Sequence, residues 1–268
     1  MPHIHRWINE RPDVDWLEIH SCNFITSSPN LALLRQLKDH YPLSFHGVSL
    51  NLGGTEDIDL SYLGKLKRAV DEFNPALISD HACFTAMDGV HYHDLLPVPY
   101  TMKAVEHIAE RIAKVQDFLG RKILLENVSR YYNYPNSDLT EAEFLNAIAE
   151  HSSCGLLLDL NNAFVNEINH QESATELLHV IDFEKVKEIH LGGFHREGNL
   201  LIDSHSTPVS DEVWALLRNC LAQLAPYSPP LLIEWDNQLP ELNDLLVEQQ
   251  KAKKIQARFK NVDQRILA

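Results

Sequence analysis

Long apolar segments are missing from this 268-residue chain. No stretch approaches the roughly 20 uninterrupted apolar residues that a membrane-spanning helix needs. The first ten residues, MPHIHRWINE, also lack the charged-then-apolar layout of a secretory signal. We therefore expect a soluble, cytoplasmic protein with no membrane partner.

Cysteine and basic residues are scarce. The four cysteines are far apart and form no CxxC pair, which argues against a disulfide framework. With 23 basic against 38 acidic residues, the formal net charge is -15, so no nucleic-acid partner is expected. No GxSxG motif and no helix-opening phosphate loop is present. The chain does have 15 histidines beside its many carboxylates, which is the raw material of a metal site.

Seven short apolar runs indicate the fold. They stay apolar without alternating, which is typical of parallel strands that helices cover on both faces. Helical patterns lie between the runs, so the sequence predicts an α/β fold, a TIM (β/α)8 barrel. The runs are VDWLEIH, PLSFHGV, ALISDHA, KILLENV, GLLLDLN, VKEIHLG and PPLLIEWD, and the helical patterns cover residues 31–40, 60–73, 101–119, 140–151, 211–224 and 239–259.

The domain organisation is expected to be simple. No Gly/Ser linker or change of composition divides the chain, so residues 1–268 form one predicted domain with a helical tail from about residue 239. Only a short helical segment, HRWINERP, precedes the first apolar run. The first barrel strand is therefore expected to be missing or truncated, unless the true start of the protein lies upstream of Met1.

Each apolar run ends in side chains that can bind metal. The carboxyl ends of TIM-barrel strands converge on one face, so these residues are expected to meet there. Mixed imidazole and carboxylate ligands suit zinc, iron or manganese, and so many donors would serve two or three ions, bridged by carboxylates such as Glu126 or Glu234. The strand-end candidates are Glu18, His20, His46, Asp80, His81, Glu126, Asn127, Asp159, His190 and Glu234, and the following loops add Asn162, Asp203 and His205.

A plainer interpretation exists for each residue alone. A single strand-end His or Asp is more often a helix cap or a hydrogen-bonded polar residue than a ligand. Asp159 would then cap the turn after it, and Asp80 would orient His81. His91 and His93 form an HxH pair that is expected in a solvated polar loop. The coincidence of such residues at all the strand ends nevertheless favours the metal site.

The same motifs, in order, resemble those of the multinuclear non-heme iron-dependent oxidases. The match extends from about Asp15 to Asp236, and Cys22 stands where many relatives have an acidic residue before the Asn-aromatic pair. The matching segments are Glu18, Asn23 and Phe24, then FHGVSLNLG (45–53), SDH (79–81), LLENVS (124–129), LLLDLNNAFVN (156–166), IHLGGF (189–194), IDSH (202–205) and LIEWD (232–236).

This resemblance implies a TIM barrel that holds two or three iron ions and uses O2 as co-substrate. Characterised relatives modify cysteine, or occasionally other residues, in ribosomally made precursor peptides, usually with a small partner protein that binds the leader of the peptide. The implied catalytic residues are Glu126, Asp159 and His190, and Glu18, Asn23, Asp80 and Asn127 would orient ligands or contact substrate. The implied metal ligands are His46, His81, Glu126, Asp159, Asn162, His190, Asp203, His205 and Glu234.

Two other functions remain open on the sequence alone. A zinc or manganese hydrolase or isomerase of the xylose-isomerase or endonuclease-IV type also arrays His, Asp and Glu at barrel strand ends. A barrel that has lost its chemistry and serves as a binding scaffold would hold little metal. Metal analysis separates both alternatives from the iron-dependent oxidase.

Overall fold

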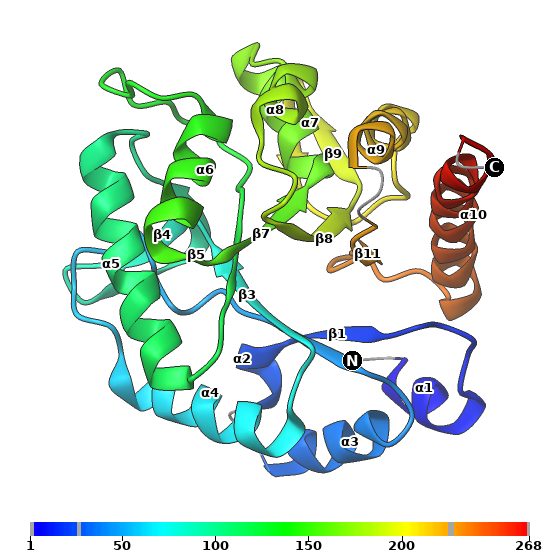
Figure 1. Ribbon diagram of the computed structural model, residues 1–268. Coiled ribbons are helices and arrows are strands. Elements are labelled where there is room, and N and C mark those ends of the chain that lie inside the picture. Colours follow the sequence, from blue (N-terminus) through cyan, green and yellow to red (C-terminus); the bar gives the residue numbers. More distant parts are fainter. Residues whose placement is uncertain (1–2, 26–27, 225–227, 267–268) are drawn as a thin grey trace.

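Seven parallel strands form one sheet in the computed structural model, which describes residues 3–25, 28–224 and 228–266. The sheet curves into a nearly closed barrel with helices around the outside (Figure 1), so the predicted α/β barrel class is confirmed. In sheet order the strands are β1 (Leu17–His20), β2 (Leu43–His46), β3 (Leu77–His81), β6 (Leu124–Glu126), β7 (Gly155–Asp159), β8 (Val186–Leu191) and β11 (Leu231–Ile233).

The predicted helices all form, with ends that shift by a few residues. The described residues form three further helices, of which α2 and α8 are short. The third, α7, begins directly after β7 because the Asp159 side chain accepts a hydrogen bond from Asn162 N (2.7 Å) and caps the helix. The helices are α1 (Ile4–Glu10), α2 (Ser21–Phe24), α3 (Ser28–Lys38), α4 (Leu60–Phe73), α5 (Met102–Leu119), α6 (Glu141–Ser152), α7 (Leu160–His170), α8 (Ala174–Val180), α9 (Asp211–Leu224) and α10 (Leu242–Ile266). Among the residues described, no helix combines the length and apolarity that crossing a bilayer requires.

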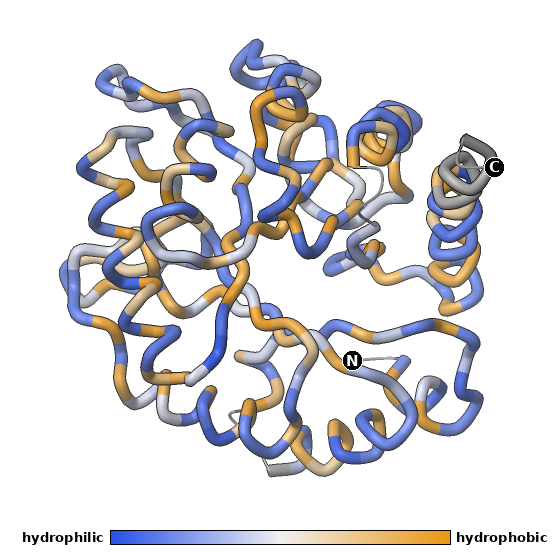
Figure 2. Tube along the Cα trace, in the orientation of Figure 1, coloured by the Kyte–Doolittle hydropathy of each residue, from blue (hydrophilic) through white to orange (hydrophobic). Residues whose placement is uncertain are grey.

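Strand alternation sends apolar and polar side chains to opposite sides of the barrel wall. Phe45 of β2 is fully buried and its ring lies 6.1 Å from that of Phe73 on α4, so this face belongs to the strand–helix core. The neighbouring Ser44 and His46 face the barrel interior, where the Ser44 hydroxyl donates to Glu18 (3.1 Å). Figure 2 shows the apolar residues concentrated along the strands and the helix faces that cover them. Burial of the outer strand face thus fixes the inward direction of the polar one.

Register brings the ends of the strands to one level. His46 pairs with Ser79, His81 with Glu126, and Asp159 with His190 across neighbouring parallel strands. The last residue of each strand therefore sits at, or within two residues of, the end of its neighbour. This is the convergence that the sequence predicts for a barrel face.

The sheet does not close between β1 and β11. Within the described part of the chain, neither strand has a hydrogen-bonded partner on its outer edge, so the expected absence of one barrel strand agrees with the topology. An apolar groove runs along this seam between the two strands and the adjoining helices, and Trp16, Leu17, Ile233 and Trp235 line part of it.

In the part of the chain that the structure describes, two antiparallel hairpins follow strands of the barrel. The first follows β3 and consists of β4 (Cys83–Met87) and β5 (Val90–Pro97); the second follows β8 and consists of β9 (Phe194–Glu197) and β10 (Leu200–Asp203). The expectation of a polar loop around His91 and His93 was wrong, because both residues lie on β5. The signal for the first hairpin was the Asp88-Gly89 pair, whose φ angles of 53° and 73° are those that a tight hairpin turn requires.

Candidate metal centre

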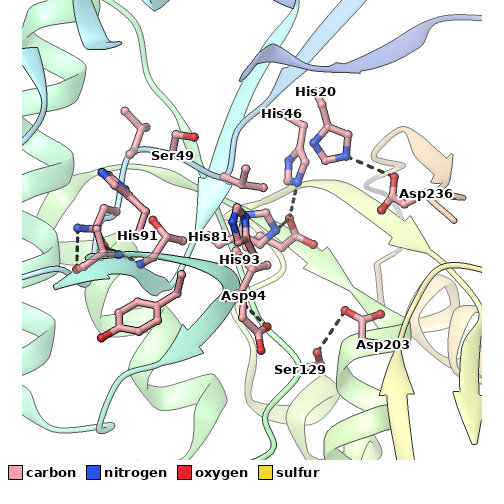
Figure 3. A pocket seen from close by; sticks show the side chains of 18 of the residues that line it. His20, His46, Ser49, His81, His91, His93, Asp94, Ser129, Asp203 and Asp236 are labelled. Carbon is pink, nitrogen blue, oxygen red and sulfur yellow. Dashed lines mark hydrogen bonds and ion pairs between the residues drawn. The ribbon is translucent and has the colours of Figure 1, made fainter. Parts of the chain in front are cut away.

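His46, His81 and Glu126 form the first group of candidate ligands. Glu126 Oε2 lies 3.3 Å from His46 Nε2 and 3.1 Å from His81 Nε2. Each imidazole is held through its other nitrogen: His46 Nδ1 bonds to the Ser79 hydroxyl (2.7 Å), and His81 Nδ1 donates to the Gly47 carbonyl (3.0 Å). Both Nε2 atoms are thus aimed at one carboxylate oxygen, as Figure 3 shows for His46. Anchoring of Nδ1 in this way is how proteins fix a metal-binding histidine.

Glu126 also belongs to a second group. Its ligand atoms and those of Asp159, His190 and Glu234 all lie within 4.8 Å of one another. His190 Nδ1 donates to Glu234 Oε2 (2.9 Å) and lies 3.8 Å from Glu126 Oε1. Because one carboxylate serves both groups, two ions bound here would share Glu126 as a bridge.

Asp203 and His205 lie beside the second group. Asp203 Oδ1 is 2.7 Å from His205 Nε2, and the Asp203 carboxylate accepts hydrogen bonds from Ser129 (3.2 Å) and Asn161 (2.8 Å). His205 Nδ1 donates to Asp236 (3.1 Å) and is 3.5 Å from Glu234. Figure 3 shows Asp203 and Ser129 at the edge of the cavity, facing each other.

Two buried oxygen atoms of these groups have no partner, and three more potential ligand atoms have a charged neighbour but no hydrogen bond of good geometry. A buried polar atom without a partner costs about 1–3 kcal/mol, so native proteins rarely keep several together without a ligand. Their chemistry is imidazole nitrogen, carboxylate oxygen and amide oxygen, the donor set of a transition-metal centre. The residues therefore fit a metal cluster. The two oxygens without any partner are Asp159 Oδ2 and Asn162 Oδ1. Glu126 Oε2, His190 Nε2 and His205 Nε2 form no hydrogen bond of good geometry, but each lies close to another side chain of the cluster, at 3.1, 3.4 and 2.7 Å.

Burial and charge divide the histidines into two kinds. Burial lowers the pKa of His46 well below its usual value and the pKa of His81 to about 4, so both are neutral at pH 7. Burial acts in the same direction on His190 and His205, but the carboxylates around them outweigh it and raise both pKa values well above the usual range. Without bound ions these two imidazoles are protonated, and their positive charges neutralise the carboxylates that bound metal ions would neutralise instead.

Metal binding is therefore expected to release protons. At pH 7 the protons of His190 and His205, and that of Glu126, whose pKa burial raises well above its usual range, must leave as ions bind. We expect roughly two to three protons per cluster formed. Calorimetric titration with Mn²⁺ or Fe²⁺ in two buffers of different ionisation enthalpy measures this number. Substitution His205→Ala should lower it by about one proton, and a titration without proton release would contradict the assigned charge states.

Two asparagines hold the second group in place. Asn127 makes a reciprocal pair with the Asp159 backbone: its amide donates to the carbonyl (3.0 Å) and its oxygen accepts from the N–H (2.8 Å). The Asn162 amide nitrogen donates to the Asn127 carbonyl (3.0 Å), which turns Asn162 Oδ1 towards the cluster. The position of two candidate ligands thus depends on Asn127.

Substitution Asn127→Ala should weaken metal binding without removing a ligand. Loss of a residue that orients metal ligands typically costs about 10–100-fold in metal affinity. Competition with a chelator of known affinity measures the change, and Asn136→Ala in an exposed loop is the matched control. Equal metal affinities of the Asn127 and Asn136 variants would mean that the reciprocal pair is not needed to position Asp159.

The structure brings together the nine residues proposed as ligands. The residues proposed to orient ligands or contact substrate lie in different surroundings. Asp80 accepts from His81 N (2.7 Å) and Leu50 N (3.0 Å) and so fixes the strand end. Glu18 faces His190 Nε2 at 3.4 Å. Asn23 is not brought to the cluster: it lines the seam groove, and its carbonyl accepts from Asn30 (2.7 Å).

Three further polar residues lie at the site that sequence reasoning left out of the ligand set. Asp236 joins His205 to His20 (3.3 Å), and His20, Glu234 and Asp236 can together approach one ion. Glu188 is fully buried and both of its carboxylate oxygens lack a hydrogen-bond partner. Glu188 lies two residues before His190 on β8, so the two-residue period of a strand was a usable signal for it, whereas Asp236 lies beyond the end of β11.

Comparisons with known proteins agree with this geometry. Residues 1–257 match the family model for the RiPP precursor modification enzymes MbnB/TglH/ChrH, where RiPP denotes a ribosomally synthesised and post-translationally modified peptide. A UPF0276 protein of Psychromonas ingrahamii is 41% identical over 256 residues, which cover 94% of this chain and 90% of the relative. A UPF0276 protein of Chromobacterium violaceum is 40% identical over 254 residues, or 95% of this chain and 91% of the relative.

Solved structures with the same fold include sugar epimerases. D-psicose 3-epimerase from Clostridium cellulolyticum H10 superposes with a TM-score of 0.64 at 13% identity, covering 97% of this chain and 93% of the epimerase. An L-ribulose 3-epimerase gives a TM-score of 0.61 at 13% identity, with 100% and 93% covered. At such low identity these structures share the barrel fold alone. The family match and the sequence relatives show that this chain belongs to the MbnB/TglH/ChrH family of RiPP precursor modification enzymes.

Proposed function

We propose that this protein is a multinuclear non-heme iron-dependent oxidase that uses O2 to modify a cysteine of a ribosomally made precursor peptide. The observation that carries the proposal is the convergence of buried imidazole nitrogens and carboxylate oxygens in two adjoining ligand groups, beside the partnerless oxygens Asp159 Oδ2 and Asn162 Oδ1. Family membership supports a precursor peptide as the substrate. A small partner protein that binds the leader of the peptide is part of the proposal.

The proposed iron cluster has two or three ions. His46, His81 and Glu126 would hold one, and Glu126, Asp159, His190 and Glu234 a second, with Asn162, Asp203 and His205 completing the set. When bound, iron supplies the electrons and the open coordination positions that reaction with O2 requires.

The protein's own residues would bind and orient the substrate. A cavity of about 700 Å³ lies over the candidate cluster and is bounded by the hairpin β4–β5 and by the loops that follow the strands. A peptide side chain entering it would meet the two neutral imidazoles of His46 and His81. Tyr131, whose hydroxyl accepts from Asp203 N (2.8 Å), borders the same space.

Metal analysis and oxygen consumption together test the proposal. The protein is purified without added metal, loaded with Fe²⁺, Mn²⁺ or Zn²⁺ under nitrogen, and mixed with a cysteine-containing precursor peptide, a reductant and oxygenated buffer. We expect oxygen consumption, and a mass change in the peptide, with the iron-loaded protein alone. Equal turnover with zinc or manganese and no oxygen uptake would instead support the hydrolase or isomerase alternative. A protein that binds no metal would support the scaffold alternative.

A further inference from the structure

The hairpin β4–β5 has one covered edge and one open edge. The outer edge of β4 is covered by Asn51, whose side chain accepts from Thr85 N (2.7 Å) and donates to the Ala86 carbonyl (3.2 Å), and by Gly53 N, which donates to the Cys83 carbonyl (2.7 Å). On the other side, β5 has β4 as its one strand partner in the described chain. The edge of β5 is thus free to pair with an extended segment.

The open edge of β5 borders the cavity over the candidate cluster. Side chains of consecutive strand residues point to opposite faces, yet residues 91–95 all line the cavity. A strand presents successive residues to one space when its edge, and not its face, is turned towards that space. Figure 3 shows His91, His93 and Asp94 on the hairpin beside His81. Since β4 begins two residues after His81, the edge starts close to the proposed ligands.

A bulge leaves backbone groups of this edge outside the hairpin ladder. The partner of Phe84 is Leu96, but the partner of Ala86 is His91, so residues 92–95 lie opposite Thr85 alone. Bulges of this kind are common beside active sites, where they release a strand from its partner. Backbone groups of residues 92–94 and the Leu95 carbonyl are therefore available to a third strand, whereas the Leu95 N–H donates to the Asp94 carboxylate (2.9 Å).

The second hairpin provides a comparison on the same chain. The outer edge of β10 is also covered by an asparagine: Asn169 donates to the Leu201 carbonyl (2.9 Å) and accepts from Leu201 N (2.9 Å). Its partner β9 is exposed over most of its length, but no β9 residue lines the cavity. Of the two described hairpins, β4–β5 is the one that offers an open edge to the candidate cluster.

The outer part of the cavity is acidic. Glu56, Asp57 and Asp59, from the segment between β2 and α4, and Asp94 of β5 all line it. No Lys or Arg is among the described residues that line this cavity. Arg111 donates to the carbonyl of Glu56 (2.6 Å), but its side chain is buried beneath the loop and does not line the cavity. Metal ions bound to the cluster would neutralise the inner carboxylates, and the negative charge of these four outer carboxylates would remain.

We propose that the substrate peptide binds in an extended conformation as a third strand along the open edge of β5, and that its residues beside the modified position include Lys or Arg. The inference rests on the proposed function for the peptide nature of the substrate. Backbone pairing with β5 would provide affinity that is independent of sequence, as in other cases of strand addition. The four outer carboxylates would favour a peptide with positive charge beside the modified residue over one with negative charge there.

Peptide binding to the iron-loaded protein under nitrogen tests the proposal. The probes are two fluorescein-labelled ten-residue peptides with a central cysteine, one flanked by four lysines and the other by four glutamates. At pH 8 and low salt we expect the lysine peptide to bind about tenfold more tightly by fluorescence anisotropy. The difference should shrink in 0.5 M NaCl and in the double variant Asp57→Asn, Asp94→Asn. Equal affinities for the two peptides would overturn the charge selection.

Hydrogen exchange locates the binding edge. The lysine peptide should slow amide exchange in residues 90–97 of β5, whereas residues 194–203 of the second hairpin should exchange as before. Protection of the second hairpin, or of neither hairpin, would overturn strand addition at β5. Neither readout requires O2, so binding at β5 is established separately from oxidation. A peptide that binds β5 under nitrogen but is not oxidised when O2 is then admitted would contradict the proposed oxidase activity and leave this docking site standing.

Discussion

Substitution Glu126→Gln is expected to remove metal from both ligand groups while the fold survives. Glu126 is the residue common to the group that contains His46 and His81 and to the group that contains His190. A glutamine has the same shape, but its NH2 group cannot coordinate an ion, and the negative charge that would bridge two ions is lost. We expect activity to fall by more than the roughly 100-fold that the loss of a mere orienting residue causes.

The stability of the metal-free protein separates this effect from misfolding. Burial raises the pKa of Glu126 well above its usual value, so the metal-free protein gains little from the ionised carboxylate at this position. The Gln variant should unfold at the same temperature as the wild type, or at a higher one, in the presence of a chelator. In the presence of metal it should lose most of the stabilisation that ligand binding gives the wild type.

Elemental analysis of the purified proteins provides the direct measurement. Glu150→Gln is the matched control, because Glu150 lies exposed on α6, away from the candidate cluster. A Glu126→Gln protein that retained the full metal content of the wild type would rule out the bridging role. A variant that lost one ion and kept the others would place Glu126 in a single ligand group.

The strand ends were the part of the site that the sequence could predict. An apolar run followed at once by His, Asp or Glu identifies both the end of a strand and the residue presented there, because parallel strands converge on one barrel face. His46, His81, Glu126 and His190 were found in this way, and the register pairs His81 directly with Glu126. Local pattern and global topology agree at these positions.

The parts that the sequence did not reveal depend on contacts between distant segments. The run LLLDLNN contains no separate turn, since Asp159 ends β7 and caps α7 at the same time, so the helix after it was missed. The grouping of Asp236 with His20 joins residues 216 positions apart and follows from the near-closure of the barrel. Strand β5 begins with the exposed run Val-His-Tyr-His-Asp, whose polar residues fall on both faces, so the sequence pattern there resembles that of a loop.

Substitution His190→Ala is expected to destabilise the metal-free protein by an amount that depends on pH. The His190 imidazole is fully buried and lies 2.9 Å from Glu234, 3.4 Å from Glu18 and 3.7 Å from Glu188. The positive charge of His190 neutralises part of the charge of these carboxylates. Removal of one partner of a buried ion pair typically lowers the free energy of unfolding by about 3–5 kcal/mol. The expected loss is therefore large compared with that caused by an ordinary surface substitution.

The sign of the pH dependence follows from the carboxylates that remain. Burial already raises the pKa of Glu18 to about 7 despite the favourable charge of His190, and removing that charge raises it further. A carboxyl group whose folded-state pKa exceeds its unfolded value contributes stability at low pH and loses it as the pH rises through the folded pKa. The deficit of the variant should therefore grow from pH 5 to about pH 6.5. Above that pH it should level off, because the proton that His190 binds only in the folded state then also costs the wild type stability.

Chemical denaturation of the metal-free proteins at pH 5, 6, 7 and 8 measures this deficit. His179→Ala, at an exposed position of α8, is the matched control and should change stability little at any of these pH values. A deficit for His190→Ala that stays constant from pH 5 to 8 would mean that lost packing, and not uncompensated charge, explains it. A deficit that narrows on acidification, and that bound metal also reduces, would show that His190 and the metal ions neutralise the same carboxylates.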